Sequence, residues 1–254
     1  MTQALKDKEE AGAGCPMQFE RSRGTPDQEG FVELVRTSEV ARSHPADSAL
    51  ADVLEWMHDF LSQPHPELGR KGAVCPFVPV ALEKDSIQMA QIVDPNPSVE
   101  SVEATIRRFR DLFLITEPTR GPEAINKAFV VVFPNLSADS ASLVDTVQSR
   151  LKKEFIDCGL MLGEFHMSNK KAGLRNAEFR PLRSPIPMLG MRQMVDSDLP
   201  FLDRADYQPE QRSSFLRSYL FRLGGSLSLA RFDQAMDGLI AAEAEKGRAG
   251  ALAQ

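Results

Sequence analysis

Apolar residues recur every three or four positions in several stretches of the chain, the spacing that lays one apolar stripe along an α-helix. Ser48 or Asp47 can cap the first stretch, and Ser137 or Asp139 the third. Gly159 suits the left-handed turn that ends a helix. The pattern therefore predicts helices over residues 50–61, 99–113, 137–158, 209–223 and 227–242.

Shorter apolar runs between these helices predict strands. Residues 128–133 are rich in β-branched side chains and end at a proline, as expected of a buried strand. Residues 86–93 alternate imperfectly between apolar and polar side chains, and residues 160–167 form another short apolar run. Residues 187–195 are a candidate fourth strand.

Strands and helices thus alternate along the middle of the chain. This order favours an α+β fold in which helices pack on one face of a mixed or antiparallel sheet. Within that class we expect a ferredoxin-like α/β sandwich with further helices at both ends. Residues 1–29 are polar and lack an apolar period, which predicts a disordered tail; residues 30–245 would form a single domain, and residues 246–254 a frayed tail.

Composition limits the classes of function. The chain has 254 residues, enough for one substantial core. Its net charge of −6 argues against nucleic-acid binding, which needs a broad basic face. No run approaches about 18 apolar residues and no secretory signal opens the chain, so we expect no membrane partner and a cytoplasmic location. The sequence leaves open whether the protein forms a homo-oligomer.

Residues 174–195 concentrate cations, prolines and methionines as no other segment does. The range from residue 167 to 192 holds Lys170, Lys171, Arg175, Arg180, Arg183 and Arg192. Prolines close to Arg180 and Arg183 keep the backbone extended, which lowers the entropic cost of ordering a clamp for an anion. Arg180, Arg183 and Arg192 are therefore candidate ligands for a small anionic substrate. The alternative is a solvated crossover loop.

Cys75 and His166 are the candidate reactive residues. Cys75 precedes a proline, and Arg70 and Lys71 nearby would favour its thiolate. His166 ends a predicted strand beside the arginine-rich segment. A thiolate or an imidazole can ligate haem iron, and together they can act as nucleophile and base. Either residue can also be purely structural.

Two further residues of the arginine-rich segment can have either a structural or a functional role. Asn176 can form an Asx turn or orient a substrate. Met188 can fill the core or form a polarizable wall against a flat cofactor. Both therefore join the candidate cofactor-binding residues.

Four segments together resemble a family of uncharacterised bacterial and fungal domains found beside natural-product pathways. These segments are residues 74–82, 128–133, 164–167 and 174–188. More loosely, the order of a Pro/Cys/Phe loop, a Val-rich strand and an Arg-containing late loop resembles the haem-dependent amino-acid N-oxygenases. This chain has Cys-Pro-Phe where that group has Phe-Pro-Cys.

The looser resemblance implies a haem-binding biosynthetic oxygenase acting on a small amino-acid-like or carboxylate substrate. Cys75 or His166 would ligate the iron, and Arg180, Arg183 and Arg192 would hold propionates or the substrate carboxylate. Two alternatives stand beside it. One is a non-catalytic accessory protein that binds an anionic ligand. The other is a cofactor-free enzyme in which Cys75 is the nucleophile and His166 the base.

Overall fold

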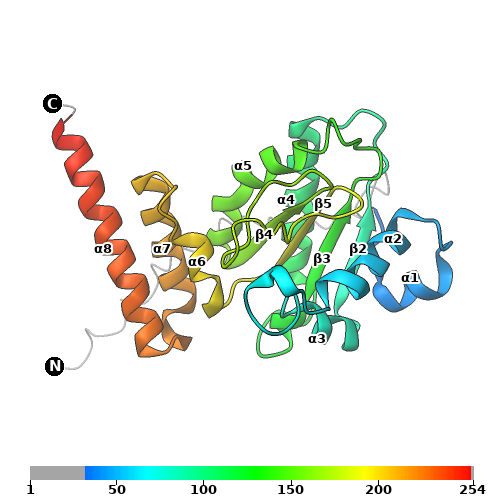
Figure 1. Ribbon diagram of the computed structural model, residues 1–254, viewed down its shortest axis with the longest axis horizontal. Coiled ribbons are helices and arrows are strands. Elements are labelled where there is room, and N and C mark those ends of the chain that lie inside the picture. The colour runs from blue at the N-terminus through cyan, green and yellow to red at the C-terminus, as the bar shows by residue number, and fades with distance from the viewer. Residues whose placement is uncertain (1–31, 253–254) are drawn as a thin grey trace, which may run out of the picture. The chain divides into compact units, whose positions relative to one another are not determined.

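The computed structural model describes the backbone of residues 32–252 and is built on one mixed, five-stranded sheet (Figure 1). Its strands are β1 (Val35–Arg36), β2 (Ile87–Gln91), β3 (Ala128–Val132), β4 (Leu160–Phe165) and β5 (Met188–Gln193). They lie in the order β1-β2-β3-β5-β4. Strands β2 and β3 pair in parallel, and all other pairs are antiparallel. The predicted tail, residues 1–29, lies outside the described residues.

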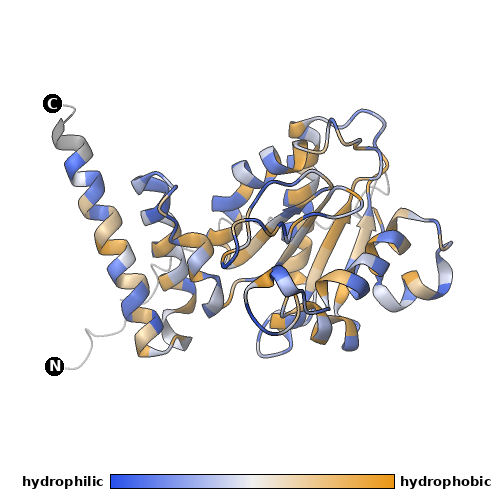
Figure 2. Cartoon of the chain, in the orientation of Figure 1, coloured by the Kyte–Doolittle hydropathy of each residue, from blue (hydrophilic) through white to orange (hydrophobic). Residues whose placement is uncertain are grey.

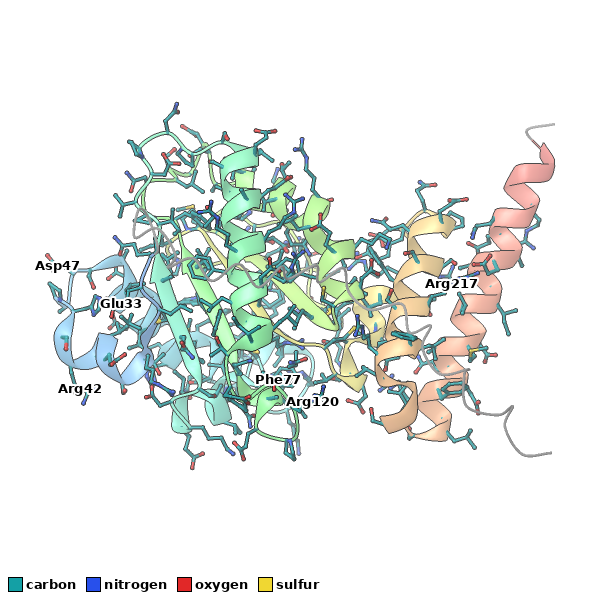
Figure 3. All side chains as sticks on the ribbon, turned by 180° about the vertical axis from the view of Figure 1, so that it is seen from behind. Glu33, Arg42, Asp47, Phe77, Arg120 and Arg217 are labelled. Carbon is teal, nitrogen blue, oxygen red and sulfur yellow. The ribbon has the colours of Figure 1, made fainter. Side chains whose placement is uncertain are left out.

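The side chains of β3 alternate between two apolar cores, as the pleat of a strand requires. Phe129 and Val131 point to one face, which α4 (Val99–Ile115) and α5 (Leu143–Asp157) cover; α4 lies in front of the sheet in Figure 3. Val130 and Val132 point to the other face. In Figure 2 the strands are accordingly mostly orange, the colour of hydrophobic residues.

The second face is covered by shorter elements and by loops. They are α1 (Thr37–Ser43), α2 (Ala49–Trp56), the π-helix η1 (Met57–Leu61), α3 (Val78–Glu83) and the long loop 166–187. Ser48 caps α2, since its Oγ accepts a hydrogen bond from the Ala51 N–H at 3.2 Å. The apolar stripe of residues 50–61 thus packs on the sheet.

The predicted α+β sandwich with a mixed sheet is confirmed. The ferredoxin-like order within it is wrong: from β2 onward the chain runs β-α-β-α-β-β, whereas a ferredoxin-like unit runs β-α-β-β-α-β. Helices also cover both faces of the sheet, not one. Apolar periodicity indicates that one side of a helix is buried, but it does not indicate which face of the sheet that side packs against.

Most long elements begin and end close to their predicted limits. One exception is α5, which begins at Leu143 because residues 137–142 form turns held by local serine hydrogen bonds. A second is α8 (Leu229–Leu252), which runs past the predicted end at Ala242. The sequence missed the short helices α1, α3 and α6 (Leu199–Leu202).

The C-terminal helices form a third core beside the sheet. There α6, α7 (Pro209–Leu223) and α8 pack around the buried Leu199, Phe215 and Tyr219, with Ile156 from α5. The Tyr219 hydroxyl donates to the Asp196 carbonyl at 2.8 Å. Short 3-10 helices complete the described chain at Pro66–Leu68, Ala124–Asn126, Asp196–Asp198 and Gly224–Ser226. No helix within residues 32–252 is long and apolar enough to cross a membrane.

One outer strand of the sheet is short, and two outward carbonyls of the other are bonded by side-chain amides. At one edge, β1 has only two residues. At the other edge, the outward carbonyl of Leu162 in β4 accepts a hydrogen bond from Gln148 Nε2 at 3.0 Å. The Glu164 carbonyl of the same strand accepts one from Asn169 Nδ2 at 3.4 Å.

Lys127 closes the C-terminal end of α4 from inside the protein. Its side chain is 1% exposed, and Nζ donates to the Phe113 carbonyl at 2.7 Å and the Thr116 carbonyl at 2.5 Å. Nζ also lies 4.2 Å from the centre of the Phe113 ring. Burial lowers the pKa of Lys127 from its ordinary value of 10.5 to about 8.

Stability is therefore expected to rise with pH above pH 8. Between pH 8 and 10.5 the unfolded chain holds a proton on Lys127 that the folded chain has released, so raising the pH favours folding. Urea unfolding at about pH 7.5 and 9.5 measures this effect. The wild-type free energy of unfolding should rise by about 1–2 kcal/mol more than that of a Lys127→Met variant. Lys71→Met, at an exposed lysine, should behave as wild type; equal rises in all three proteins would refute the assignment.

Candidate functional site

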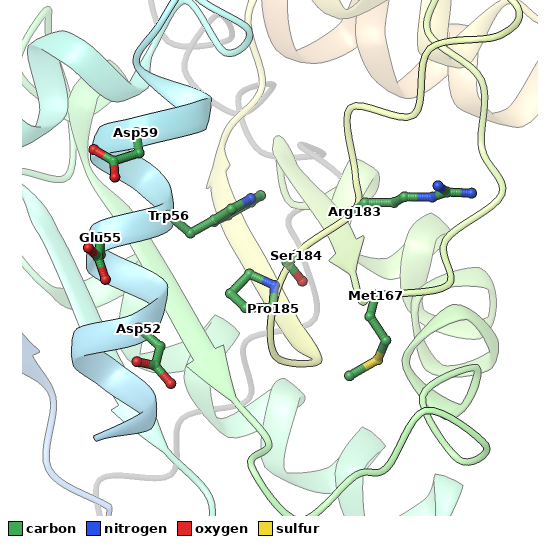
Figure 4. A pocket seen from close by; sticks show the side chains of 8 residues that line it. All are labelled: Asp52, Glu55, Trp56, Asp59, Met167, Arg183, Ser184 and Pro185. Carbon is green, nitrogen blue, oxygen red and sulfur yellow. The ribbon is translucent and has the colours of Figure 1, made fainter. Parts of the chain in front are cut away.

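A groove of about 500 Å³ lies between α2 and the long loop 166–187 (Figure 4). Its lining residues are Asp52, Glu55, Trp56, Asp59, Met167, Arg183, Ser184 and Pro185. The first four are spaced by three, one and three positions, which puts them on one face of the α2–η1 helix. The π-helix begins directly after Trp56, and π-helical turns are frequent at functional sites.

The helical wall of the groove is aromatic and negatively charged. Trp56 is half-buried, packing edge-to-face on Phe165 with ring centres 5.8 Å apart and stacking on Phe60 at 5.9 Å. Among the described residues, no side chain forms an ion pair or hydrogen bond with the carboxylates of this wall. Three unpaired negative charges thus lie on the same helical wall as one indole ring.

The loop wall contributes one cation. Arg183 is exposed, and its side chain extends away from Trp56 in Figure 4. Its Nε donates to the Asn169 carbonyl at 3.2 Å. None of the described residues accepts a hydrogen bond from its two terminal nitrogens. Arg183 is therefore available to an anionic group of a ligand.

His166 lies just behind this wall and is buried, with 2% of its surface exposed. Its Nε2 lies 3.0 Å from Asp145 Oδ2, in the first turn of α5. Its Nδ1 lies 3.1 Å from the Oγ of the exposed Ser168. The three side chains form one hydrogen-bonded chain, in which the buried imidazole lies between the exposed Ser168 and a carboxylate that is 39% exposed.

A family model described as a domain of unknown function, DUF6875, matches residues 50–230, which is more than half of the chain. The chain belongs to the DUF6875 family. The matched range runs from α2 into α8 and includes every residue of the groove and of the hydrogen-bonded chain. No curated protein and no solved structure matches the sequence.

The expected resemblance to an uncharacterised domain family is thus confirmed. The DUF6875 match carries no link to natural-product pathways or to N-oxygenases.

In this DUF6875 member, two of the three predicted anion ligands are engaged inside the protein. Arg192 makes a bidentate ion pair with the buried Asp198, at 2.6 and 2.8 Å. Arg180 donates to the backbone carbonyls of Ala177 and Phe179. Of the three predicted arginines, only Arg183 lines the groove.

Asn176 and Met188 make structural contacts in this chain. Asn176 Oδ1 accepts the Glu178 N–H at 2.9 Å in an Asx turn, and its Nδ2 donates to the Glu67 carbonyl at 2.8 Å. It thereby ties the long loop to the segment after η1. Met188 is 1% exposed in the core beneath the long loop. The geometry therefore favours the Asx turn for Asn176 and the core position for Met188.

The two predicted iron ligands lie toward opposite ends of β5. Cys75 is a half-buried free thiol two residues before Phe77, whose ring centre lies 4.4 Å from the Arg192 guanidinium near the end of that strand. His166 follows Phe165, which pairs with Met188 at its start. Met188 and Arg192 are four residues apart, which corresponds to about 13 Å along a strand. Cys75 and His166 therefore lie at different places along β5.

Both ring nitrogens of His166 are also already bonded. The described residues contain no cluster of three or more His, Cys, Asp or Glu side chains arranged to hold a metal ion. Ligation of haem iron by Cys75 or by His166 stays a prediction.

The sequence missed Asp52, Glu55, Trp56, Asp59, Asp145 and Ser168. The spacing of the first four is visible as the polar face of the helix predicted over residues 50–61. Nothing in the sequence shows that the long loop lies opposite that face. Asp145 and Ser168 carry no local signal, because their link to His166 forms only when α5 packs beside β4.

Proposed function

We propose that this protein binds a small amino-acid-like ligand in the groove between α2 and the long loop. The observation that carries the proposal is the set of three unpaired carboxylates around Trp56, with Arg183 on the facing wall. A cytoplasmic accessory protein that holds an amino-acid-like intermediate of a biosynthetic pathway fits this chemistry.

The helical wall suits the ammonium end of such a ligand. A cation placed over an indole face gains about 0.5–2 kcal/mol. Asp52, Glu55 and Asp59 add Coulomb attraction on the same side. A ligand that is only an anion would meet these carboxylates as like charges, so a zwitterion or an amine is favoured over a simple carboxylate.

The loop wall suits the carboxylate end. The guanidinium of Arg183 offers two terminal nitrogens in the geometry that pairs with a carboxylate. Because the side chain is long and exposed, it can turn toward the groove when the ligand binds.

Trp56 is the single tryptophan of the chain, so its fluorescence reports directly on the groove. Titration with a panel of amino acids should change the emission saturably. The matching amines should do so more weakly, and the matching carboxylic acids without an amine should have no effect. Binding of the carboxylic acids alone, lost in Arg183→Ala, would instead indicate the simple anion site expected from the sequence.

A triple variant, Asp52→Asn with Glu55→Gln and Asp59→Asn, should raise the dissociation constant at least tenfold, which corresponds to about 1.4 kcal/mol. Calorimetric titration measures the change. The matched control is Asp47→Asn, on the exposed turn before α2 (Figure 3), which should bind as wild type. An unchanged dissociation constant in the triple variant would remove the carboxylates from the proposal.

A further inference from the structure

The hydrogen-bonded chain Asp145–His166–Ser168 has the arrangement of an activated hydroxyl. His166 Nε2 is 3.0 Å from Asp145 Oδ2, and Nδ1 is 3.1 Å from Ser168 Oγ. The imidazole is shielded from solvent, whereas the serine is exposed. A buried base next to an exposed hydroxyl is the geometry that nucleophilic catalysis needs.

The bonding partners fix the roles of the two ring nitrogens. A carboxylate only accepts hydrogen bonds, so Asp145 assigns the ring proton of neutral His166 to Nε2. Nδ1 then carries the lone pair and can only accept. The Ser168 hydroxyl therefore donates its proton to Nδ1, the direction in which a general base would remove it.

The position of the imidazole is fixed by the backbone around it. The His166 N–H donates to the Leu182 carbonyl at 3.3 Å, and the His166 carbonyl accepts from the N–H groups of Asn169 at 3.1 Å and Ser184 at 3.4 Å. These bonds join the two ends of the long loop beside the ring. The base is thus preorganised before any ligand binds.

Two cationic residues lie close to Ser168, one along the chain and one through a backbone hydrogen bond. Lys170 is exposed two residues later, and Arg183 bonds the carbonyl of Asn169, the next residue after Ser168. Lys171 forms an ion pair with the buried Glu164, which offsets its charge. An acyl substrate that carries a carboxylate would be attracted to this turn.

We propose that Ser168 is a nucleophile toward esters of small, negatively charged acyl groups, with His166 as its general base and Asp145 as a positioning residue. This proposal goes beyond ligand binding in the groove and does not depend on it.

In the proposed reaction, Ser168 Oγ forms a bond to the acyl carbonyl carbon while its proton passes to His166 Nδ1. The bond between that carbon and the leaving oxygen breaks, and the leaving alcohol takes the proton from Nδ1. A water molecule then attacks the acyl-serine, gives one proton to Nδ1 and releases the acid, and Ser168 regains its hydrogen. Asp145 stabilises the transient imidazolium through Nε2.

The test is covalent labelling of the full chain with a fluorophosphonate probe, located by peptide mass spectrometry. Labelling should concentrate on Ser168 and disappear in Ser168→Ala. Asp145→Asn, a partly exposed position, should slow labelling at least tenfold, and His166→Gln by more. Ser197→Ala, at another exposed serine, should label as wild type.

A thermal unfolding curve of each variant shows that it is folded. Because His166 is buried, the Asp145→Asn rate decides the outcome if His166→Gln does not fold. Hydrolysis of a succinate monoester of p-nitrophenol, with an initial burst near one equivalent, is the expected second readout. Labelling of Ser168 no faster than Ser197, or a rate unchanged in folded Asp145→Asn, would overturn the proposal and leave the hydrogen bonds a purely structural role.

Discussion

Replacing Asp198 with alanine is expected to lower the free energy of unfolding by about 3–5 kcal/mol. Asp198 is 1% exposed and makes three hydrogen bonds, two with the Arg192 guanidinium and one with the Val195 N–H at 2.9 Å. Removing the carboxylate leaves a positive charge largely shielded from water and without its anion. Urea unfolding followed by far-UV circular dichroism measures the loss.

Arg192 keeps two weaker contacts in that variant. Its Nη1 donates to the Gln193 carbonyl at 2.8 Å, and its guanidinium lies 4.4 Å from the centre of the Phe77 ring. The matched control is Asp196→Ala, two residues earlier and exposed, which should change stability by less than about 0.5 kcal/mol. A loss below about 1 kcal/mol for Asp198→Ala would show that the ion pair is not a strong support of this end of the sheet.

Replacing Phe113 with alanine is expected to cost about 3–5 kcal/mol of stability as well, by a different cause. Phe113 is 0% exposed near the end of α4, and its ring packs edge-to-face on Phe129 of β3, with centres 5.0 Å apart. Truncation removes buried apolar surface and leaves a cavity. It also removes the ring beneath the Lys127 ammonium.

Two comparisons test this explanation. Phe221→Ala, at a phenylalanine that is 67% exposed, should change stability by less than about 0.5 kcal/mol. A double-mutant cycle of Phe113→Ala with Lys127→Met should show a coupling energy of about 0.5–1 kcal/mol or more. Strict additivity would mean that the lysine is held by the backbone carbonyls alone.

Elements that bury one regular face were predictable from the sequence. The limits of α7 coincide with the predicted 209–223, and β3 ends one residue before the predicted limit. The short helices α1 and α3 have seven and six residues, too few for an apolar period to be counted. The strand order could not be predicted, because pairing depends on contacts between residues far apart in sequence.

The candidate site was predicted only in part, for a related reason. The sequence singled out Arg183 and His166, and both lie at the loop wall or directly behind it. The sequence could not show that Arg183 is available to a ligand and Arg192 is not. The difference is the ion pair that Arg192 forms with Asp198, which lies in a 3-10 turn. Charge counts describe what a segment carries, and tertiary contacts decide which of those charges remain available.

The side-chain amides along β4 bear on how this protein behaves at high concentration. A long outer strand with free carbonyls is a template onto which another chain can add a strand, and aggregates grow by repeating that step. Here Gln148 and Asn169 already occupy the outward carbonyls of Leu162 and Glu164. Edge-to-edge polymerisation through β4 would first have to displace both amides.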